Sequence, residues 1–139
     1  MIEVVNRQRK VRIDPERWRP FSEKALTAIR RAADDATIAF VSDRQIKELN
    51  RRFRGIAKAT DVLSFPAGEE TTAPNANLGD IAISLERAAD QAKENKLTLD
   101  DEIAQLILHG LLHLCGYDHE TDNGEMNRLE RKLRAKLKI

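Results

Sequence analysis

The stretch from residue 103 to residue 115 constrains the fold more than any other part of this chain. It is long enough for a helix, and every residue in it except Gln105, His109 and His113 is apolar or glycine. On an ideal helical wheel these three side chains share one narrow stripe with Glu102. A helix that is apolar almost all round belongs in the protein interior, and a buried polar group needs a partner. The sequence therefore predicts a central buried helix whose polar stripe faces a cavity, a partner group or a metal ion.

Four short runs rich in apolar residues predict strands. They span residues 2–5, 37–41, 61–65 and 80–84. The last two are separated by PAGEETTAPNANLG, residues 66–79, and the turn-forming residues in this segment predict a mobile loop.

Capping residues indicate where the helices begin and end. Pro20 is expected to break or restart the first helix, so that Ser22 and Glu23 open its more regular part. Gly116 is expected to end the long apolar helix in a left-handed conformation. Helices are expected after Asp14 and Pro15, from Ser42 to Gly55 with Gln45 completing a capping box, from Ser84 to Asn95, from Thr98 with Asp101 to Cys115, and from about Asn123 to the end.

Together these elements predict a single α/β (α+β) domain over residues 1–139, in which a small mixed four-stranded sheet is covered by about five helices. The metal site is expected on the buried helix and the turn after it. No apolar run approaches the roughly 20 residues of a membrane span, and no secretory signal is recognisable. The single cysteine, Cys115, cannot form an internal disulfide. We therefore expect a cytoplasmic protein without membrane association.

Charge is distributed unevenly along the chain, although the net charge is only +1. Segments 1–31, 43–58 and 128–139 have balances of +5, +4 and +5, whereas segment 59–127 has a balance of −11. If folding brings the basic segments together, they form a face suited to a phosphate backbone. Solvated helix surfaces explain the same pattern equally well.

All three histidines lie within HGLLHLCGYDH, residues 109–119. His109 and His113 are four residues apart and therefore lie on one helix face, while Gly116 turns the chain so that His119 returns toward them. The pattern HxxxHxxGxxH offers three neutral nitrogen ligands and leaves the fourth position of a tetrahedral ion open. It predicts a site for one Zn²⁺, with other transition metals as alternatives. An ion with three neutral ligands keeps its double charge and lowers the pKa of a bound water to about 7.

Three neighbours of the histidines bear on the chemistry. Asp118 either orients a ligand histidine or is an ordinary turn residue. Cys115 falls about 160° from His113 on the wheel and is expected to point into the core. Gly110 stands where metzincin proteases, which share the histidine spacing, have the glutamate that acts as general base. A glycine within a helix, which costs about 1 kcal/mol relative to alanine, indicates either close packing or open space beside the metal.

Four motifs together resemble the YbeY family of bacterial endoribonucleases and ribosomal RNA maturation factors. They are HGLLHLCGYDH (109–119), TDVLSFP (60–66), LGDIAIS (78–84) and FRG (53–55), and they extend over residues 53–119, about half of the chain. The resemblance implies a metal-dependent endoribonuclease that is specific for single-stranded RNA, matures the 3′ end of 16S rRNA and acts in ribosome quality control. It implies RNA, the small ribosomal subunit and its assembly factors as partners. It also implies that His109, His113 and His119 hold the metal and that Arg54 is catalytic.

The implied chemistry suits these residues, because a metal ion and the Arg54 guanidinium both stabilise charge on the non-bridging oxygens of a phosphodiester. A hydroxide on the ion either attacks phosphorus or removes the proton of the 2′-hydroxyl, and the sequence leaves both routes open. One alternative is a ribosome-assembly or RNA-binding factor with a mainly structural metal, and a metzincin-like metalloprotease is a weaker one. Arg54 alone is also explained as a cation at the end of its helix.

Overall fold

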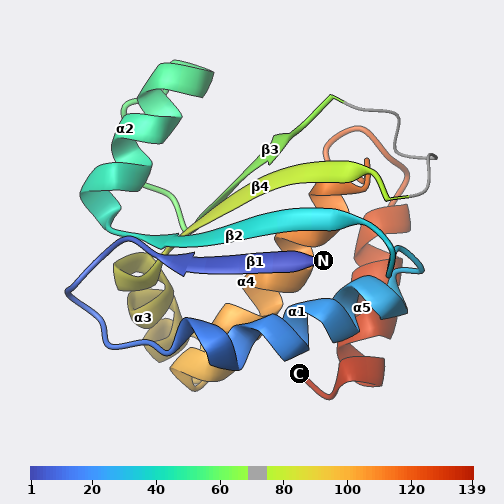
Figure 1. Cartoon of the computed structure of the whole chain (residues 1–139). Coiled ribbons are helices and arrows are strands. Elements are labelled where there is room, and N and C mark those ends of the chain that lie inside the picture. The colour runs from blue at the N-terminus through green and yellow to red at the C-terminus, as the bar shows by residue number, and fades with distance from the viewer. Residues whose placement is uncertain (69–74) are drawn as a thin grey trace.

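The computed structural model describes residues 1–68 and 75–139. Within these residues it confirms the predicted α/β architecture of a four-stranded mixed sheet with five helices (Figure 1). No helix among them is both long and apolar enough to span a bilayer. In chain order the elements are β1 (Ile2–Asn6), α1 (Pro15–Ala28), β2 (Asp35–Val41), α2 (Asp43–Arg54), β3 (Val62–Pro66), β4 (Asn77–Ser84), α3 (Leu85–Glu94), α4 (Leu99–Leu114) and α5 (Glu125–Leu137).

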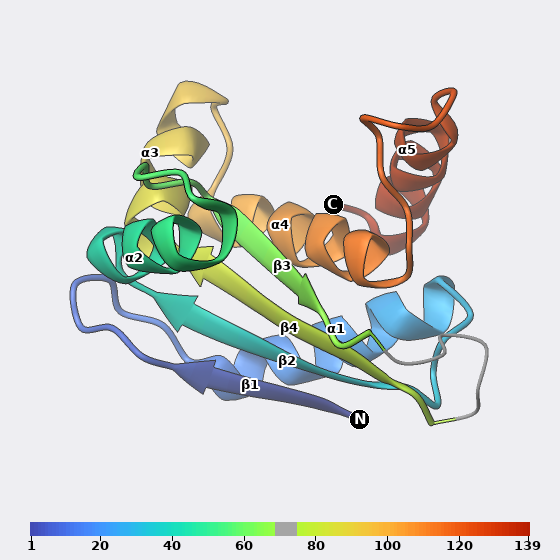
Figure 2. The same cartoon turned by 90° about the horizontal axis from the view of Figure 1, so that it is seen from above.

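The strands are arranged in the order β1-β2-β4-β3. β1, β2 and β4 are parallel, and β3 pairs antiparallel with β4 at one edge. α1 packs against β1, and α4 packs against β3 and β4 on the same face of the sheet (Figure 1). α2 projects from the opposite face, at the end of the sheet where α3 begins (Figures 1 and 2).

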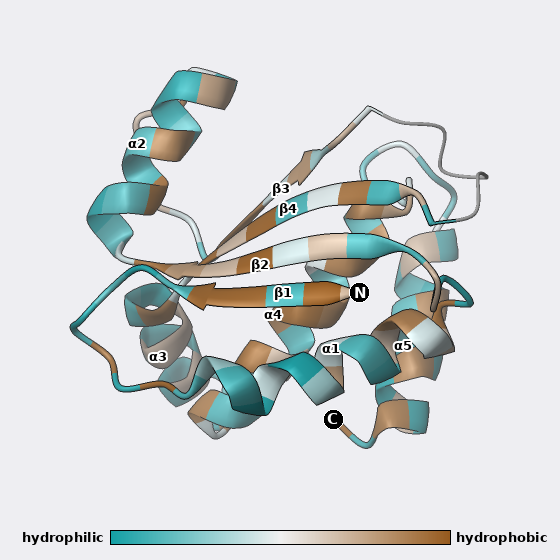
Figure 3. Cartoon of the chain, in the orientation of Figure 1, coloured by the Kyte–Doolittle hydropathy of each residue, from teal (hydrophilic) through white to brown (hydrophobic). Residues whose placement is uncertain are grey.

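α4 is the buried central helix that the sequence predicts. Ile107, Leu108 and Leu111 on its apolar circumference are fully buried. Hydropathy colouring shows largely apolar residues on α4 and on the strands above it, in contrast to the mostly polar α2 (Figure 3). A Cβ added to Gly110 would lie 2.9 Å from Cδ1 and 3.0 Å from Cγ2 of Ile81 on β4. Close packing against the sheet, rather than open space beside the metal, therefore explains this glycine.

The predicted helix caps are present. Ser42 Oγ accepts from the Gln45 backbone N–H at 3.1 Å, and the Gln45 side chain accepts from the Ser42 backbone N–H at 2.8 Å. Gly55 ends α2 in the left-handed conformation with φ of 70°. Thr98 Oγ1 accepts from the Asp101 backbone N–H at 3.1 Å at the start of α4. These caps fix both ends of α2 and the beginning of α4.

The predicted break in the first helix is wrong, because α1 is continuous over Pro15–Ala28 with Pro20 inside it. Pro20 removes only the bond to the carbonyl of Glu16, an exposed residue in the first turn of the helix. Ser22 does not open a helix, since it is fully buried and its hydroxyl donates to the Trp18 carbonyl at 2.7 Å. Burial of one face of α1 outweighs the missing hydrogen bond.

The loop predicted over residues 66–79 is shorter than expected, because Pro66 ends β3 and residues 77–79 begin β4. Gly79 has φ of 127°, and a Cβ there would lie 2.2 Å from the Phe65 carbonyl oxygen. Glycine therefore allows the two strands to approach at this point. The central part of the predicted mobile loop, residues 69–74, lies outside the described residues. The last helix begins at Glu125, two residues later than predicted.

The basic segments come together only in part. Lys10 Nζ lies 3.6 Å from Glu86 Oε2, and the Asp43 backbone N–H at the start of α2 donates to Glu86 Oε1 at 3.1 Å. The basic N-terminal loop and α2 therefore meet at this glutamate. α5, which carries most of the basic segment 128–139, lies at the opposite end of the molecule from α2 (Figures 1 and 2). The basic segments 43–58 and 128–139 therefore lie apart, whereas α1, which belongs to the first basic segment, packs against α5.

Candidate metal centre and active site

The three histidines converge on one point at the C-terminal end of α4. The Nε2 atoms of His109 and His113 are 3.1 Å apart, and their ring centroids are 4.6 Å apart. The ring of His119 lies 5.7 Å from that of His109 and 5.6 Å from that of His113. One ligand nitrogen from each of the three lies within 4.8 Å of the other two. The spacing predicted from the sequence therefore places all three rings around a common centre.

The turn after α4 brings His119 to this centre. Gly116 has φ of 97°, its N–H donates to the His113 carbonyl at 3.0 Å, and the N–H of Tyr117 donates to the Leu112 carbonyl at 3.1 Å. This pair of bonds is the Schellman arrangement, which satisfies the last carbonyls of a helix while reversing the chain. The local sequence thus supplies both the helical pair and the turn that returns the third histidine.

Asp118 stabilises the same turn. Its carboxylate accepts from the Glu120 backbone N–H at 3.0 Å, and its carbonyl accepts from the Thr121 N–H at 3.2 Å. On the far side of His119, the Asp122 carboxylate accepts from the N–H groups of Gly124 at 2.8 Å and Met126 at 2.9 Å. These bonds lower the pKa of Asp122. The exposed His119 is therefore held between two short turns fixed by aspartates.

Glu130 on α5 contacts a candidate ligand histidine from outside the histidine group. Its Oε1 lies 2.9 Å from His109 Nδ1, and its exposed fraction is 7%. Burial raises the pKa of Glu130, but the hydrogen bond from His109 and the charges of His109 and Arg134 outweigh it and hold the pKa below its usual value. An ionised carboxylate at Nδ1 keeps the proton on that nitrogen and leaves the lone pair on Nε2, directed toward His113.

The sequence offers only a weak signal for Glu130. It is the single acidic residue in the basic segment 128–139, and it is buried where its neighbours Arg131 and Lys132 are exposed. Its contact with His109 depends on how α5 packs beside α4, which local patterns do not encode.

The pKa of His113 is lowered, first by burial and then by the neighbouring His109 and His119. The charge of Asp118 and a backbone hydrogen bond to Tyr117 act in the opposite direction without reversing the shift. A lowered pKa keeps the ring neutral, which is the form of imidazole that binds metals.

The donor set fits a transition-metal ion. Ligand distances of about 2.0–2.1 Å in tetrahedral geometry place neighbouring nitrogens about 3.3 Å apart. The separation of 3.1 Å between the Nε2 atoms of His109 and His113 is close to that value. The carboxylate behind His109 is the usual outer partner of a metal-bound imidazole. Three nitrogen donors leave one coordination position available to a substrate.

Arg54 and the histidines line the same cavity, whose volume is about 500 Å³. Arg54 is the last residue of α2 and is exposed. The cavity therefore brings together a cation from α2 and the histidines of α4, although Arg54 and His109 are 55 positions apart in the sequence. Its remaining walls come from β3 with the two residues before it and from the turn after α4: Thr60, Asp61, Val62, Leu63, Ser64, Pro66, Gly116, Tyr117, Asp118 and Glu120.

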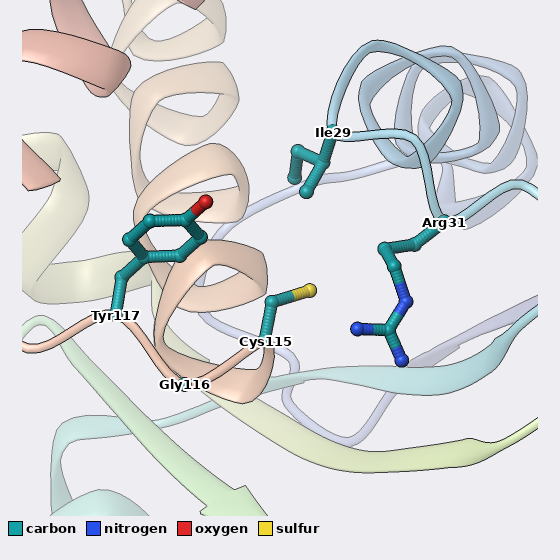
Figure 4. A pocket seen from close by; sticks show the side chains of 5 residues that line it. All are labelled: Ile29, Arg31, Cys115, Gly116 and Tyr117. Atoms are coloured by element: carbon teal, nitrogen blue, oxygen red, sulfur yellow. The ribbon is translucent and has the colours of Figure 1, made fainter. Parts of the chain in front are cut away.

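Cys115 is not part of the histidine group. Its thiol points away from Tyr117, toward Ile29 and Arg31 beyond the end of α1, where a small cavity of about 180 Å³ lies (Figure 4). Burial raises the pKa of this thiol. The side chain packs against the hydrophobic core, as the helical wheel predicts.

The family model described as Endoribonuclease YbeY matches this chain over residues 3–138. The chain belongs to the YbeY family. A YbeY relative from Nautilia profundicola, named Endoribonuclease YbeY, is 50% identical over 105 residues, which cover 76% of this chain and 73% of the relative. A relative of the same name from Thermodesulfovibrio yellowstonii is 34% identical over 154 residues, which cover 99% of this chain and 97% of the relative.

A solved structure has the same fold. The solution structure of TM1509 from Thermotoga maritima superposes with a TM-score of 0.69 at 28% sequence identity, covering 99% of this chain and 89% of that chain. The family predicted from four short motifs is thereby confirmed. With it comes the general class of the enzyme, an endoribonuclease that hydrolyses RNA.

Proposed function

We propose that this chain is a single-strand-specific, metal-dependent endoribonuclease that matures the 3′ end of 16S rRNA and acts in ribosome quality control. In this proposal residues 1–139 act as one cytoplasmic domain, with the small ribosomal subunit and its assembly factors as partners. The observation that carries the proposal is the convergence of His109, His113 and His119 in one cavity with Arg54. Membership of the YbeY family supports the choice of RNA as substrate.

The three histidines would hold one Zn²⁺. When bound, such an ion supplies Lewis acidity, which stabilises negative charge on phosphate oxygens. Glu130 keeps the proton of His109 on Nδ1 at 2.9 Å, so that Nε2 is available as a ligand. The two turns around His119 hold the third ring in reach of the other two.

Arg54 would bind the phosphate that is cleaved. A guanidinium donates two parallel hydrogen bonds to phosphate oxygens, and this arrangement orients the phosphodiester as well as stabilising its charge. Arg54 is exposed at the rim of the cavity, whereas His109 and His113 are half-buried in it. A flexible single strand reaches a recessed site more easily than a rigid duplex, which supports the preference for single-stranded RNA.

A protease is disfavoured by Gly110. A side chain at this position would point at Ile81 of β4, at 2.9 Å from its Cδ1, and not toward a substrate. The glutamate that metzincins use as general base therefore has no place here.

The test compares zinc-loaded, nuclease-free wild type with Arg54→Gln, His113→Ala and the control Arg44→Gln, which changes an exposed arginine at the other end of α2. Single-stranded and duplex RNA of the same sequence are the substrates. We expect Arg54→Gln to lower kcat about 100-fold, as the loss of one charge-stabilising donor does, with zinc content unchanged. We expect His113→Ala to lose both zinc and activity, and Arg44→Gln to resemble the wild type.

Two results would overturn the proposal. One is intact single-stranded RNA after incubation with zinc-loaded wild type, together with normal 16S rRNA ends in cells whose only copy carries His113→Ala. The other is a protein that still binds RNA after the metal is removed and that cleaves no RNA when it is loaded with zinc. This second result would indicate an RNA-binding or assembly factor with a structural metal.

A further inference from the structure

A second cavity, of about 430 Å³, adjoins the histidine cavity along α4. The two cavities share Asp61, Val62 and His109. Glu102 also lines the second cavity, and it lies seven positions before His109, which corresponds to about 10 Å of helix. A strand whose phosphate lies at the histidines therefore has its neighbouring nucleotide within reach of this cavity.

The walls of the second cavity combine apolar faces with polar groups. Val62, Leu97 and Leu106 supply apolar surface, and the polar lining groups are Asp61, Asn95, Glu102, Gln105 and Arg134. Polar residues outnumber apolar ones in this lining, so hydrogen bonds rather than apolar contact would fix the orientation of a ligand here. The cavity thus suits a flat ring with hydrogen-bonding groups on its edge.

Two carboxylates on one side of the cavity are held in place. With its amide nitrogen facing them, Gln91 donates to Asp61 Oδ2 at 3.1 Å and to Glu102 Oε1 at 2.9 Å. Asp61 Oδ1 also accepts from the Val62 N–H at 2.8 Å. These negative groups repel a phosphate, so the occupant of this cavity is not the RNA backbone. The carboxylates are positioned to accept hydrogen bonds from a neutral ligand.

Arg134 on α5 contributes a cation to the same cavity. Its Nη2 lies 3.7 Å from Glu130 Oε1. The side chain is 37% exposed and lines the cavity, so its guanidinium can donate hydrogen bonds to a ligand there. The cavity therefore offers acceptors on the Asp61 and Glu102 side and a cationic donor on the Arg134 side.

We propose that the second cavity binds the base of the nucleotide next to the cleaved phosphate and that it prefers guanine; this inference rests on the proposed RNA cleavage. Guanine presents two adjacent donors, N1–H and the 2-amino group, to a carboxylate, and its O6 and N7 accept from an arginine. Adenine and cytosine have an unprotonated ring nitrogen in place of N1–H, and uracil flanks its N–H with two carbonyl oxygens. Each of these bases would bring an acceptor against the carboxylates.

The test measures cleavage of single-stranded oligoribonucleotides that differ only in the base on the 5′ or the 3′ side of the cut, with G, A, C, U or inosine at that position. We expect guanine at one of these positions to raise kcat/KM about 10-fold over the other bases, in line with one bidentate base contact. Inosine, which lacks the 2-amino group, should lose part of this advantage.

Glu102→Gln tests the protein side. We expect it to lower kcat/KM for the guanine substrate about 10-fold and so to remove the preference, because an amide no longer accepts both donors. Glu94→Gln, which changes an exposed glutamate on α3, is the matched control and should keep the preference. The inosine series tests the same contact without altering the protein.

Equal rates for all bases at both positions, with RNA still cleaved, would overturn the guanine proposal and leave the endoribonuclease proposal standing. The proposal would also be overturned if folded Glu102→Gln kept the full guanine preference and if inosine were cleaved as fast as guanine. A wild type that cleaves no substrate would overturn the proposed function and, with it, the base site.

Discussion

The hydrogen bond between Glu130 and His109 predicts how strongly α5 affects metal binding at the proposed site. Outer partners of metal-bound histidines are worth about 10- to 100-fold in affinity, or about 1.4–2.8 kcal/mol. Glu130 is only 7% exposed, so water does not readily replace a lost carboxylate. We expect Glu130→Gln, which keeps the shape but removes the charge, to weaken Zn²⁺ binding about 10-fold. Glu130→Ala should weaken it about 100-fold, because the His109 Nδ1–H then loses its protein acceptor altogether.

Zinc affinity is measured by competition with a chromophoric chelator at about pH 7.5, with circular dichroism to verify the fold of each variant. Glu94→Gln on the exposed side of α3 is the control and should bind Zn²⁺ like the wild type. If both Glu130 variants are folded and bind Zn²⁺ within about twofold of the wild type, then the 2.9 Å contact does not orient His109 and the reasoning fails.

Three further predictions concern stability. Gly110→Ala should lower the free energy of unfolding by about 1 kcal/mol in urea, because overpacking against Ile81, about 1–3 kcal/mol, exceeds the gain of about 1 kcal/mol in helix propensity; unchanged or increased stability contradicts this. Gly79→Ala should cost at least about 3 kcal/mol in the same assay, since its Cβ would lie 2.2 Å from the Phe65 carbonyl oxygen, and a loss below about 1 kcal/mol would count against the close approach of β3 and β4. Burial raises the pKa of Glu102 in the folded chain, so the stabilisation linked to its protonated form is present below the unfolded pKa and is lost as pH rises through the folded pKa. The midpoint temperature of thermal unfolding, measured from about pH 4 to 7, should therefore fall less steeply with pH in Glu102→Gln than in the wild type. Identical slopes in the two proteins would exclude this contribution.

Features that depend on a few neighbouring residues were predictable from the sequence. The capping box of Ser42 and Gln45 and the cap of Thr98 each involve residues three apart, so the pattern contains the whole interaction. The same is true of the histidine pair and of Gly116, whose positive φ returns the chain toward α4. For this reason the candidate metal ligands could be chosen before the fold was known.

Features that depend on packing between distant elements were not predictable in this way. The sequence predicts that Pro20 interrupts α1, but burial of Trp18 and Leu26 against the core keeps the helix continuous. The sequence also predicts a loop at Gly79, whereas its close approach to Phe65 belongs to the pairing of β3 with β4. In each case a local preference is weaker than the tertiary contact that opposes it.

The same distinction explains how the candidate site is divided between its helices. α4 is buried on almost every side, so His109 and His113 are held at a fixed spacing by the core itself. α2 buries only Ile46 and Asn50, and its last turn, which carries Arg54, is exposed. In the proposed function the metal ligands need fixed distances, which the buried α4 supplies. The proposed phosphate contact of Arg54 comes instead from the exposed end of α2, where the core does not fix the side chain.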